Sequence, residues 1–252
     1  MKVIMINALK ERIRRKELYV VMVIGIFMIL FCGSNSTSIT INGEPLTGFR
    51  NMFMVMHVLI HVVGCILAVI LSINTIPREY ERHNSHLVWV RGISQTAYHG
   101  GLAAANLAAS AIAVGILYLV LAGYAAVKGY TVYVPKMIPA YLIVVVSVSL
   151  VSLWASVLSI CLPSFLTGVL TAGFAMVGIL HGFLELFRSI VGGASGLCIS
   201  ILLRVIPDLN GLQKQAYHLI MGEHVDAHLL WTALLALWVI ATGLIVLRKK
   251  EA

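Results

Sequence analysis

The most constraining feature of the sequence is a series of long apolar runs, because about 20 mostly apolar residues suffice to cross a bilayer as a helix. Of the residues, 60% are hydrophobic and 11% charged, against about 25% charged in a typical soluble domain. Such a chain cannot cover a water-facing surface with polar groups. We therefore expect an all-α polytopic membrane protein, a single transmembrane domain over residues 1–252. Its six transmembrane helices are expected at 18–33, 52–76, 101–126, 138–161, 165–188 and 228–247.

A seventh apolar stretch, residues 189–206, is short and interrupted by Gly192, Gly193 and Gly196. Glycine weakens a helix interior, so this stretch suits a re-entrant or interfacial element better than a span. We predict that residues 189–227, between the fifth and sixth helices, form such a segment on the outer side of the membrane.

The net charge of +8 would suit a nucleic-acid-binding protein, but the basic residues flank the apolar runs instead of forming a recognition face. With the N-terminus inside, twelve basic residues fall on the cytoplasmic side and six on the outer side. This bias predicts a multi-pass protein of the plasma membrane with both termini in the cytoplasm. The first apolar run follows a basic stretch, as in a signal peptide, but no cleavage site is obvious, so we expect it to be retained.

Residues 1–16 place apolar residues at helical spacing among basic ones. This pattern predicts an amphipathic helix in the membrane interface, with its cations toward anionic headgroups. A plain basic anchor that only fixes topology is an equally good interpretation.

The predicted cytoplasmic loop, residues 76–99, combines mixed charges with apolar and aromatic residues. Exposed apolar side chains on such a loop need cover, from lipid headgroups or from a partner protein. A solvated linker is the alternative.

This loop resembles the corresponding loop in permease subunits of ABC-2 type exporters. That motif has an acidic start, a leucine run, and an end of the form P-[IV]-S-R-x-x-[YF]. The matching residues are Glu79 and Glu81 for the start, Leu87 to Val90 for the run, and Arg91, Ile93, Ser94 and Tyr98 for the end. The sequence departs from the motif at Asn84 and Ser85, at Gly92 and at Gln95, and it lacks the usual lysine after the tyrosine.

The resemblance implies that the loop couples this chain to a separate ATP-hydrolysing subunit. The chain has no GxxxxGK[ST] phosphate loop, so ATP-Mg would be bound by the partner and this chain would bind no cofactor. Two permeases, as a homodimer or a heterodimer, would assemble with two ATPase subunits and export a peptide or other amphipathic compound, or confer immunity to an antimicrobial peptide. The predicted partner-binding residues are Glu79, Tyr80, Glu81, Leu87, Val88, Trp89 and Arg91.

Ionisable residues in the apolar runs are a second signal, because such groups at membrane depth usually face protein or water. Those that could line a substrate route are His57, His61, His181 and Glu185. For Glu185 the alternative is an ion pair with Arg188. Haem ligation by His57 and His61 is disfavoured, because both lie on one helix face. Ser149, Ser152, Ser156 and Ser159 form a stripe that ordinary helix packing can explain.

The cysteines lie in or beside apolar runs without a CxxC pair, so neither a disulfide framework nor a zinc site is expected. His224, Asp226 and His228 could share a divalent metal, but Asp226 as a helix cap is the better interpretation, and no metal site is predicted. Catalytic motifs such as HExxH and GxSxG are absent, so an intramembrane enzyme is the weaker hypothesis. The resemblance to ABC-2 permeases implies a non-catalytic subunit. The alternative function is a transmembrane haem or redox protein, or an intramembrane enzyme.

Overall fold

The computed structural model describes residues 2–14, 19–21, 23–27, 40–41, 44–45, 49–81, 90 and 92–247. Apart from two short antiparallel strands, β1 (Thr40–Ile41) and β2 (Glu44–Pro45), its regular elements are helical, which confirms the predicted class. The helices are α1 (Lys2–Arg14), α3 (Phe49–Ile73), α4 (Thr75–Glu81), α6 (Gln95–Val127), the 3₁₀ turn η1 (Thr131–Tyr133), α7 (Met137–Cys161), α8 (Ser164–Ile179), α9 (His181–Ile190), α10 (Gly193–Val205), α11 (Leu209–Met221) and α12 (Ala227–Val246).

Several of these helices are long and apolar enough to cross a bilayer. Within the described residues, four segments qualify: Arg50–Glu81 (α3 with α4), α6, α7 and α12. The pairs α8–α9 and α10–α11 qualify only if each bent pair is counted as one span, so the described part of the chain has four to six candidate spans. The exact count of six stays a prediction. Of its first helix, 18–33, residues 19–21 and 23–27 are described, and these are helical.

The predicted fifth helix, 165–188, is wrong as a continuous element. It breaks at Leu180 into α8 and α9, which meet at 72°. Close packing accompanies this break: a Cβ added at Gly178 would lie 2.6 Å from Leu209 Cγ and 3.1 Å from the Pro207 carbonyl oxygen. The junction between α10 and α11 therefore packs directly against the end of α8.

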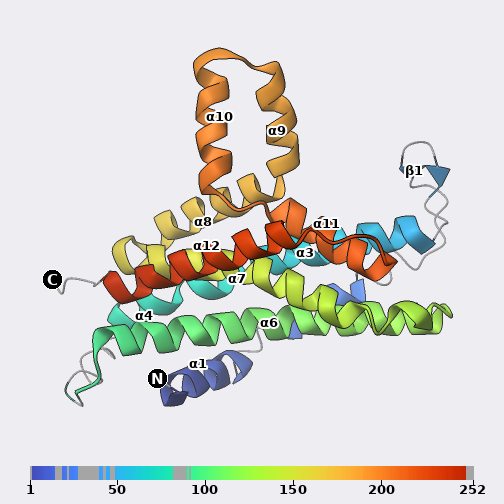
Figure 1. Ribbon diagram of the computed structural model, residues 1–252. Coiled ribbons are helices and arrows are strands. Elements are labelled where there is room, and N and C mark those ends of the chain that lie inside the picture. The colour runs from blue at the N-terminus through green and yellow to red at the C-terminus, as the bar shows by residue number, and fades with distance from the viewer. Residues whose placement is uncertain are drawn as a thin grey trace.

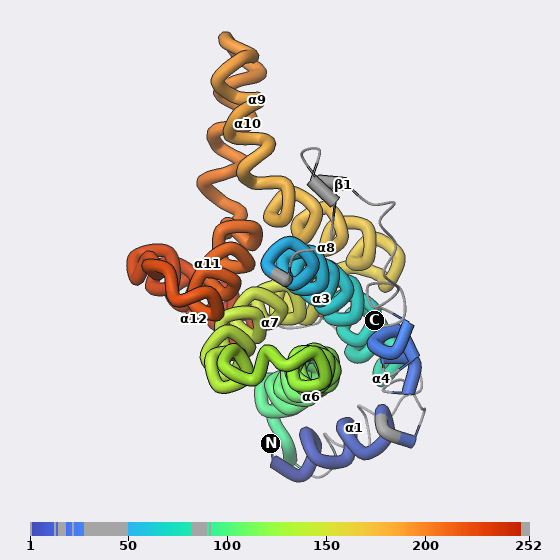
Figure 2. Tube along the Cα trace, turned by 90° about the vertical axis from the view of Figure 1, so that its right-hand side faces the viewer, coloured from blue at the N-terminus to red at the C-terminus, as the bar shows by residue number. Residues whose placement is uncertain are grey.

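The predicted non-spanning stretch, 189–206, contains the end of α9 and all of α10. These two helices form a hairpin that projects from the bundle, as both views show (Figures 1 and 2). The 13 residues of α10 extend over about 20 Å, less than the hydrocarbon thickness of about 30 Å, so α10 alone does not span. A re-entrant path for this segment stays a prediction.

The core of the bundle lies around α7, which packs against α3, α6, α8, α11 and α12 (Figure 2). The bundle has two ends (Figure 1). We call them the α4 end, which also holds the N-terminus and the end of α12, and the Arg50 end, which holds the beginning of α3, the α6–α7 turn and the α11–α12 turn. Figure 2 also shows α1 lying beside α6, against which it packs.

Candidate functional site

The two ends of the predicted coupling loop are held together by hydrogen bonds between α4 and α6. The Tyr98 hydroxyl donates to Glu79 Oε2 at 2.6 Å, and Gln95 Nε2 donates to the Tyr80 hydroxyl at 2.8 Å. The same hydroxyl lies 2.8 Å from Nε2 of the buried His99. These contacts fix the separation of the first and last turns of the loop.

Two of the predicted partner-binding residues are therefore hydrogen-bonded to other residues of this chain. Glu79 and Tyr80 are half-buried against α6, whereas Glu81 is exposed. The other predicted partner-binding residues, Leu87, Val88, Trp89 and Arg91, lie outside the described residues. Val90 between them is described and is 88% exposed, which agrees with the expected apolar surface on this loop.

Arg12, interpreted from the sequence as a cation that flanks the membrane, is instead buried. Its side chain is 8% exposed, and the two hydrogens of Nη2 are shared among three acceptors: the Leu71 carbonyl oxygen and Thr75 Oγ1, both at 2.5 Å, and Asn106 Oδ1. The last carbonyls of a helix lack partners within the helix and attract cations. Because α3 ends at Ile73, Leu71 offers such a carbonyl. The polar residues Thr75 and Asn106 were the signal for this site in the sequence.

The contacts of Arg12 continue into the centre of the bundle. Asn106 Nδ2 donates to Ser156 Oγ at 3.1 Å, and Ser156 Oγ donates to the Ser152 carbonyl oxygen at 2.9 Å. The hydroxyls of Ser152 and Ser72 lie 2.8 Å apart. Part of the serine stripe thus joins α7 to α3 and α6. We call this series of residues, from Arg12 to Ser72, the polar chain.

A polar cavity of about 160 Å³ lies beside the polar chain at the α4 end. It is bounded by charged side chains from α1 and α4 and by the turn between α3 and α4. Its polar lining residues are Glu11, Arg12, Asn74, Thr75, Arg78 and Glu79. The beginning of the coupling loop and the N-terminal helix therefore share one polar pocket.

His57 and His61, predicted to line a substrate route, are enclosed by the bundle. Both are at most 1% exposed. Gln213 Nε2 donates to His57 Nδ1 at 3.1 Å, so that nitrogen carries no proton and Nε2–H donates to the Tyr118 hydroxyl at 2.7 Å. His61 Nε2 lies 2.7 Å from Ser147 Oγ. In this structure both rings join helices to one another instead of facing an open route.

His181 and Glu185, the other residues of the predicted route, belong to the hairpin. His181, at the start of α9, lies with Nε2 3.4 Å from the Leu203 carbonyl oxygen and with Nδ1 3.8 Å from Asp208 Oδ2. Glu185 is exposed on α9. The contacts of the four residues therefore do not form one cluster, and a single route lined by all of them is not what this structure shows.

An apolar cavity of about 370 Å³ lies between α3 and α8, which sequence reasoning did not identify. Val62, Cys65 and Ile66 are among its residues from α3, and Ala172, Ala175 and Met176 among those from α8. Its lining offers no charged side chain. Such a site favours aliphatic or aromatic parts of a ligand.

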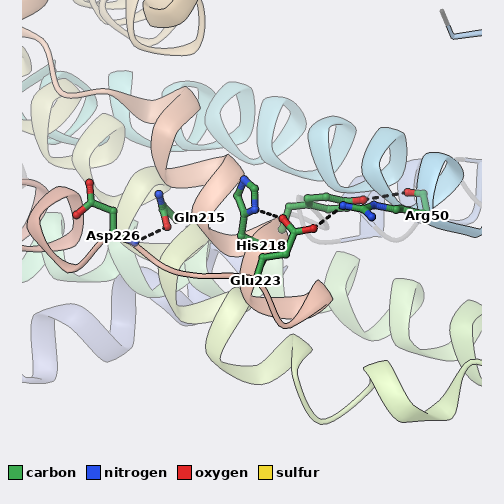
Figure 3. A network of polar contacts seen from close by, with 6 residues as sticks. Arg50, Gln215, His218, Glu223 and Asp226 are labelled. Atoms are coloured by element: carbon green, nitrogen blue, oxygen red, sulfur yellow. Dashed lines mark hydrogen bonds and ion pairs between the residues drawn. The ribbon is translucent and has the colours of Figure 1, made fainter.

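At the Arg50 end, Glu223 joins α3 to the turn after α11 (Figure 3). One carboxylate oxygen pairs with Arg50 Nη2 and the other with His218 Nδ1. The Asp226 carboxylate accepts from His228 N at 2.9 Å, so the prediction that Asp226 caps the last helix is confirmed. In the described part of the chain no three His, Cys, Asp or Glu side chains are placed to hold a metal ion.

Comparison of the chain with protein-family models, curated proteins and solved structures gave no match.

Proposed function

We propose that this chain is the permease subunit of an ATP-driven exporter of the ABC-2 type. It would lie in the plasma membrane with both termini in the cytoplasm. Two ATPase subunits would bind ATP-Mg and supply the energy, and a second permease, a copy or a homologue, would complete the assembly. The observation that carries the proposal is the hydrogen-bonded base of the loop at residues 76–99, in which Glu79 and Tyr80 are tied to α6.

A loop with a fixed base can transmit displacement, because its two ends move together. Here the base is continuous with α3 through Thr75 and with α6 through Tyr98. Arg12 links α1 to both of these helices, and Asn106 links α6 to α7. A displacement of the loop by a partner would thus be transmitted to four helices, α1, α3, α6 and α7. Glu81 and Val90 are among the exposed described residues of the loop, and we expect them to meet the partner.

The apolar cavity between α3 and α8 supports an amphipathic cargo. Its lining can hold the hydrocarbon parts of a peptide or lipid-like compound but offers no charge to a small polar solute. Desolvating a polar solute in such a site would cost free energy without compensating hydrogen bonds. We assign the substrate route to this cavity in place of the buried His57 and His61.

The assembly is tested by purifying the tagged chain from membranes of its native host in mild detergent. We expect an ATP-hydrolysing subunit to co-purify and ATPase activity to be measurable. Glu81→Ala and Trp89→Ala should reduce both, whereas Glu185→Ala, an exposed carboxylate on the hairpin, should leave both unchanged. A wild-type preparation without an ATPase, or one with a Soret absorption band, would contradict the proposal.

The cargo route is tested in the same assembly by stimulation of ATPase activity with amphipathic peptides. Ala172→Trp fills the cavity between α3 and α8 and should abolish stimulation while basal ATPase activity persists. The neighbouring Gly173 is the matched control: a Cβ there meets nothing within 4 Å, and the residue does not line the cavity. Equal stimulation of Ala172→Trp and Gly173→Trp would rule out this route.

A further inference from the structure

A second and larger apolar groove runs between α6 and α7 toward the Arg50 end of the bundle. Its volume is about 780 Å³, within the range of roughly 300–1,000 Å³ typical of small-ligand sites. The floor includes Gly115 and Tyr118, and the rim includes Leu119 and Ile138, which are 73% and 67% exposed. An exposed rim means that the groove is open on its side.

The polar groups of the groove are already used inside the protein. The Tyr118 hydroxyl is hydrogen-bonded to His57 Nε2, and the Tyr141 hydroxyl donates to the Ala111 carbonyl oxygen at 3.1 Å. The other lining residues are apolar or glycine. An occupant therefore meets a hydrocarbon surface, and a polar solute would lose its hydration without gaining partners.

The residues of the turn between α6 and α7 indicate how deep the groove lies in the membrane. Val134 and Pro135, which follow η1, line the groove at this end. Tyr130 and Tyr133 lie in the same turn, and tyrosines are enriched where a bilayer meets water. We therefore expect the turn between α6 and α7 to lie at headgroup level and the groove to lie among acyl chains.

Two cations flank this turn. Lys128 caps α6 and is exposed, and Lys136 immediately precedes α7, with Nζ 6.0 Å from the centre of the Tyr133 ring. Cations at headgroup level attract anionic lipids, at about 1 kcal/mol for each residue near the surface. A hydrocarbon groove below a basic turn is complementary to a molecule with an acyl chain and a negatively charged head.

We propose that the groove between α6 and α7 binds an acyl chain of an anionic phospholipid, with its headgroup beside Lys128. This assignment rests on the groove and its turn and does not depend on the proposed transport function. The bound lipid would fill the space between α6 and α7, both of which pack on α3. It would also contact the side chain of Tyr118, whose hydroxyl is hydrogen-bonded to His57.

The test uses the full chain reconstituted in vesicles of phosphatidylglycerol and phosphatidylcholine. Either lipid carries a photoactivatable diazirine on its acyl chain, and labelled peptides are mapped by mass spectrometry. We expect the phosphatidylglycerol probe to label residues 112–119 and 134–141, and excess unlabelled phosphatidylglycerol to remove that label. Lys128→Gln should reduce the preference for phosphatidylglycerol over phosphatidylcholine.

Gly115→Leu is the variant that fills the groove, because a Cβ at Gly115 lies in ordinary contact, 3.5 Å from the Tyr141 hydroxyl oxygen. Gly123→Leu, on the same helix with nothing within 4 Å of its Cβ, is the matched control. Loss of label in Gly115→Leu alone supports the site. Label that persists in both variants overturns it, as does label in wild type that competitor does not displace. Equal labelling by the phosphatidylglycerol probe and the phosphatidylcholine probe overturns the assignment to an anionic lipid.

Discussion

The guanidinium of Arg12 is hydrogen-bonded to the side-chain oxygen of Asn106, 94 residues further along the chain. The contact joins the N-terminal helix to α6 at the level where α3 ends, and both partners are buried. Asn106 can serve this cation because its amide oxygen accepts from Arg12 while its amide nitrogen donates to Ser156. A cation within the bundle thereby supplies hydrogens to acceptors from two helices, which otherwise have only the hydroxyl of Thr75 as a shared side-chain donor.

Loss of this cation should destabilise the bundle. Arg12→Met keeps much of the side-chain volume but removes the charged donor from Asn106 Oδ1 and the Leu71 carbonyl, which then share the single hydroxyl hydrogen of Thr75. We expect this loss to cost about 1–3 kcal/mol. The free energy of unfolding is measured in detergent by denaturant titration. Lys10→Met, at an exposed position on the same helix, should have little effect.

A double-mutant cycle separates the pair from its surroundings. If Arg12 and Asn106 act together, Arg12→Met and Asn106→Leu combined should deviate from additivity by about 0.5–3 kcal/mol. Additive effects of the two substitutions would show that the contact contributes nothing beyond the separate side chains.

The features that the sequence predicts well are those with local causes. The amphipathic pattern of residues 1–16 and the long apolar runs depend on neighbouring residues, and α1, α7 and α12 follow them to within two residues. The third predicted helix, 101–126, ends where expected, but α6 begins at Gln95, inside the loop predicted over 76–99. The burial of Arg12 has no local cause, because its acceptors lie 59, 63 and 94 residues away. From the sequence alone, a basic residue beside an apolar run is better explained by headgroups.

The candidate site shows the same division. The mixed character of the loop at 76–99 was visible in the sequence, and its exposed Val90 agrees with it. That Glu79 and Tyr80 turn inward could not be seen, because it depends on which residues of α6 face α4. The apolar cavity between α3 and α8 likewise arises from two helices that are distant in the sequence.

The break between α8 and α9 leads to a prediction about glycine. Gly178→Ala would bring a Cβ to 2.6 Å from Leu209 Cγ and 3.1 Å from the Pro207 carbonyl oxygen, so the base of the hairpin must shift. We expect a loss of about 1–3 kcal/mol, typical of overpacking. Gly173→Ala on the same helix has open space and should stabilise by up to about 1 kcal/mol. Thermal unfolding of both variants checks the difference, and a stabilising Gly178→Ala would contradict this packing.

His57 and Gln213 should behave as a coupled pair in the core. Gln213→Leu removes the donor to His57 Nδ1 and leaves that nitrogen buried without a partner, at an expected cost of about 1–3 kcal/mol. The double replacement with Leu should cost less than the sum of the two single replacements, because it leaves neither side of the His57–Gln213 contact unpaired and only the Tyr118 hydroxyl loses its donor. Denaturant titration of the two single variants and the double variant measures this difference. A double variant that loses the full sum would mean that the two side chains stabilise the bundle independently.

The ion pair of Arg50 with Glu223 offers a prediction that depends on salt. The two side chains are 66% and 34% exposed, and exposed pairs contribute about 0.2–1 kcal/mol. Arg50→Glu places two carboxylates together and should destabilise the Arg50 end, whereas Arg50→Glu with Glu223→Arg should restore part of the stability. Both the destabilisation and its recovery should become smaller when the salt concentration is raised from about 0.05 to 1 M. The reason is that the Debye length falls from above roughly 10 Å to about 3 Å, so exposed charges are screened. Arg188→Glu, an exposed charge reversal on the hairpin, controls for the change in net charge. The measurement is the unfolding midpoint at each salt concentration. If Arg50→Glu destabilises equally at both, the loss comes from packing around α3 and the turn after α11, and the charge of Glu223 is not its cause.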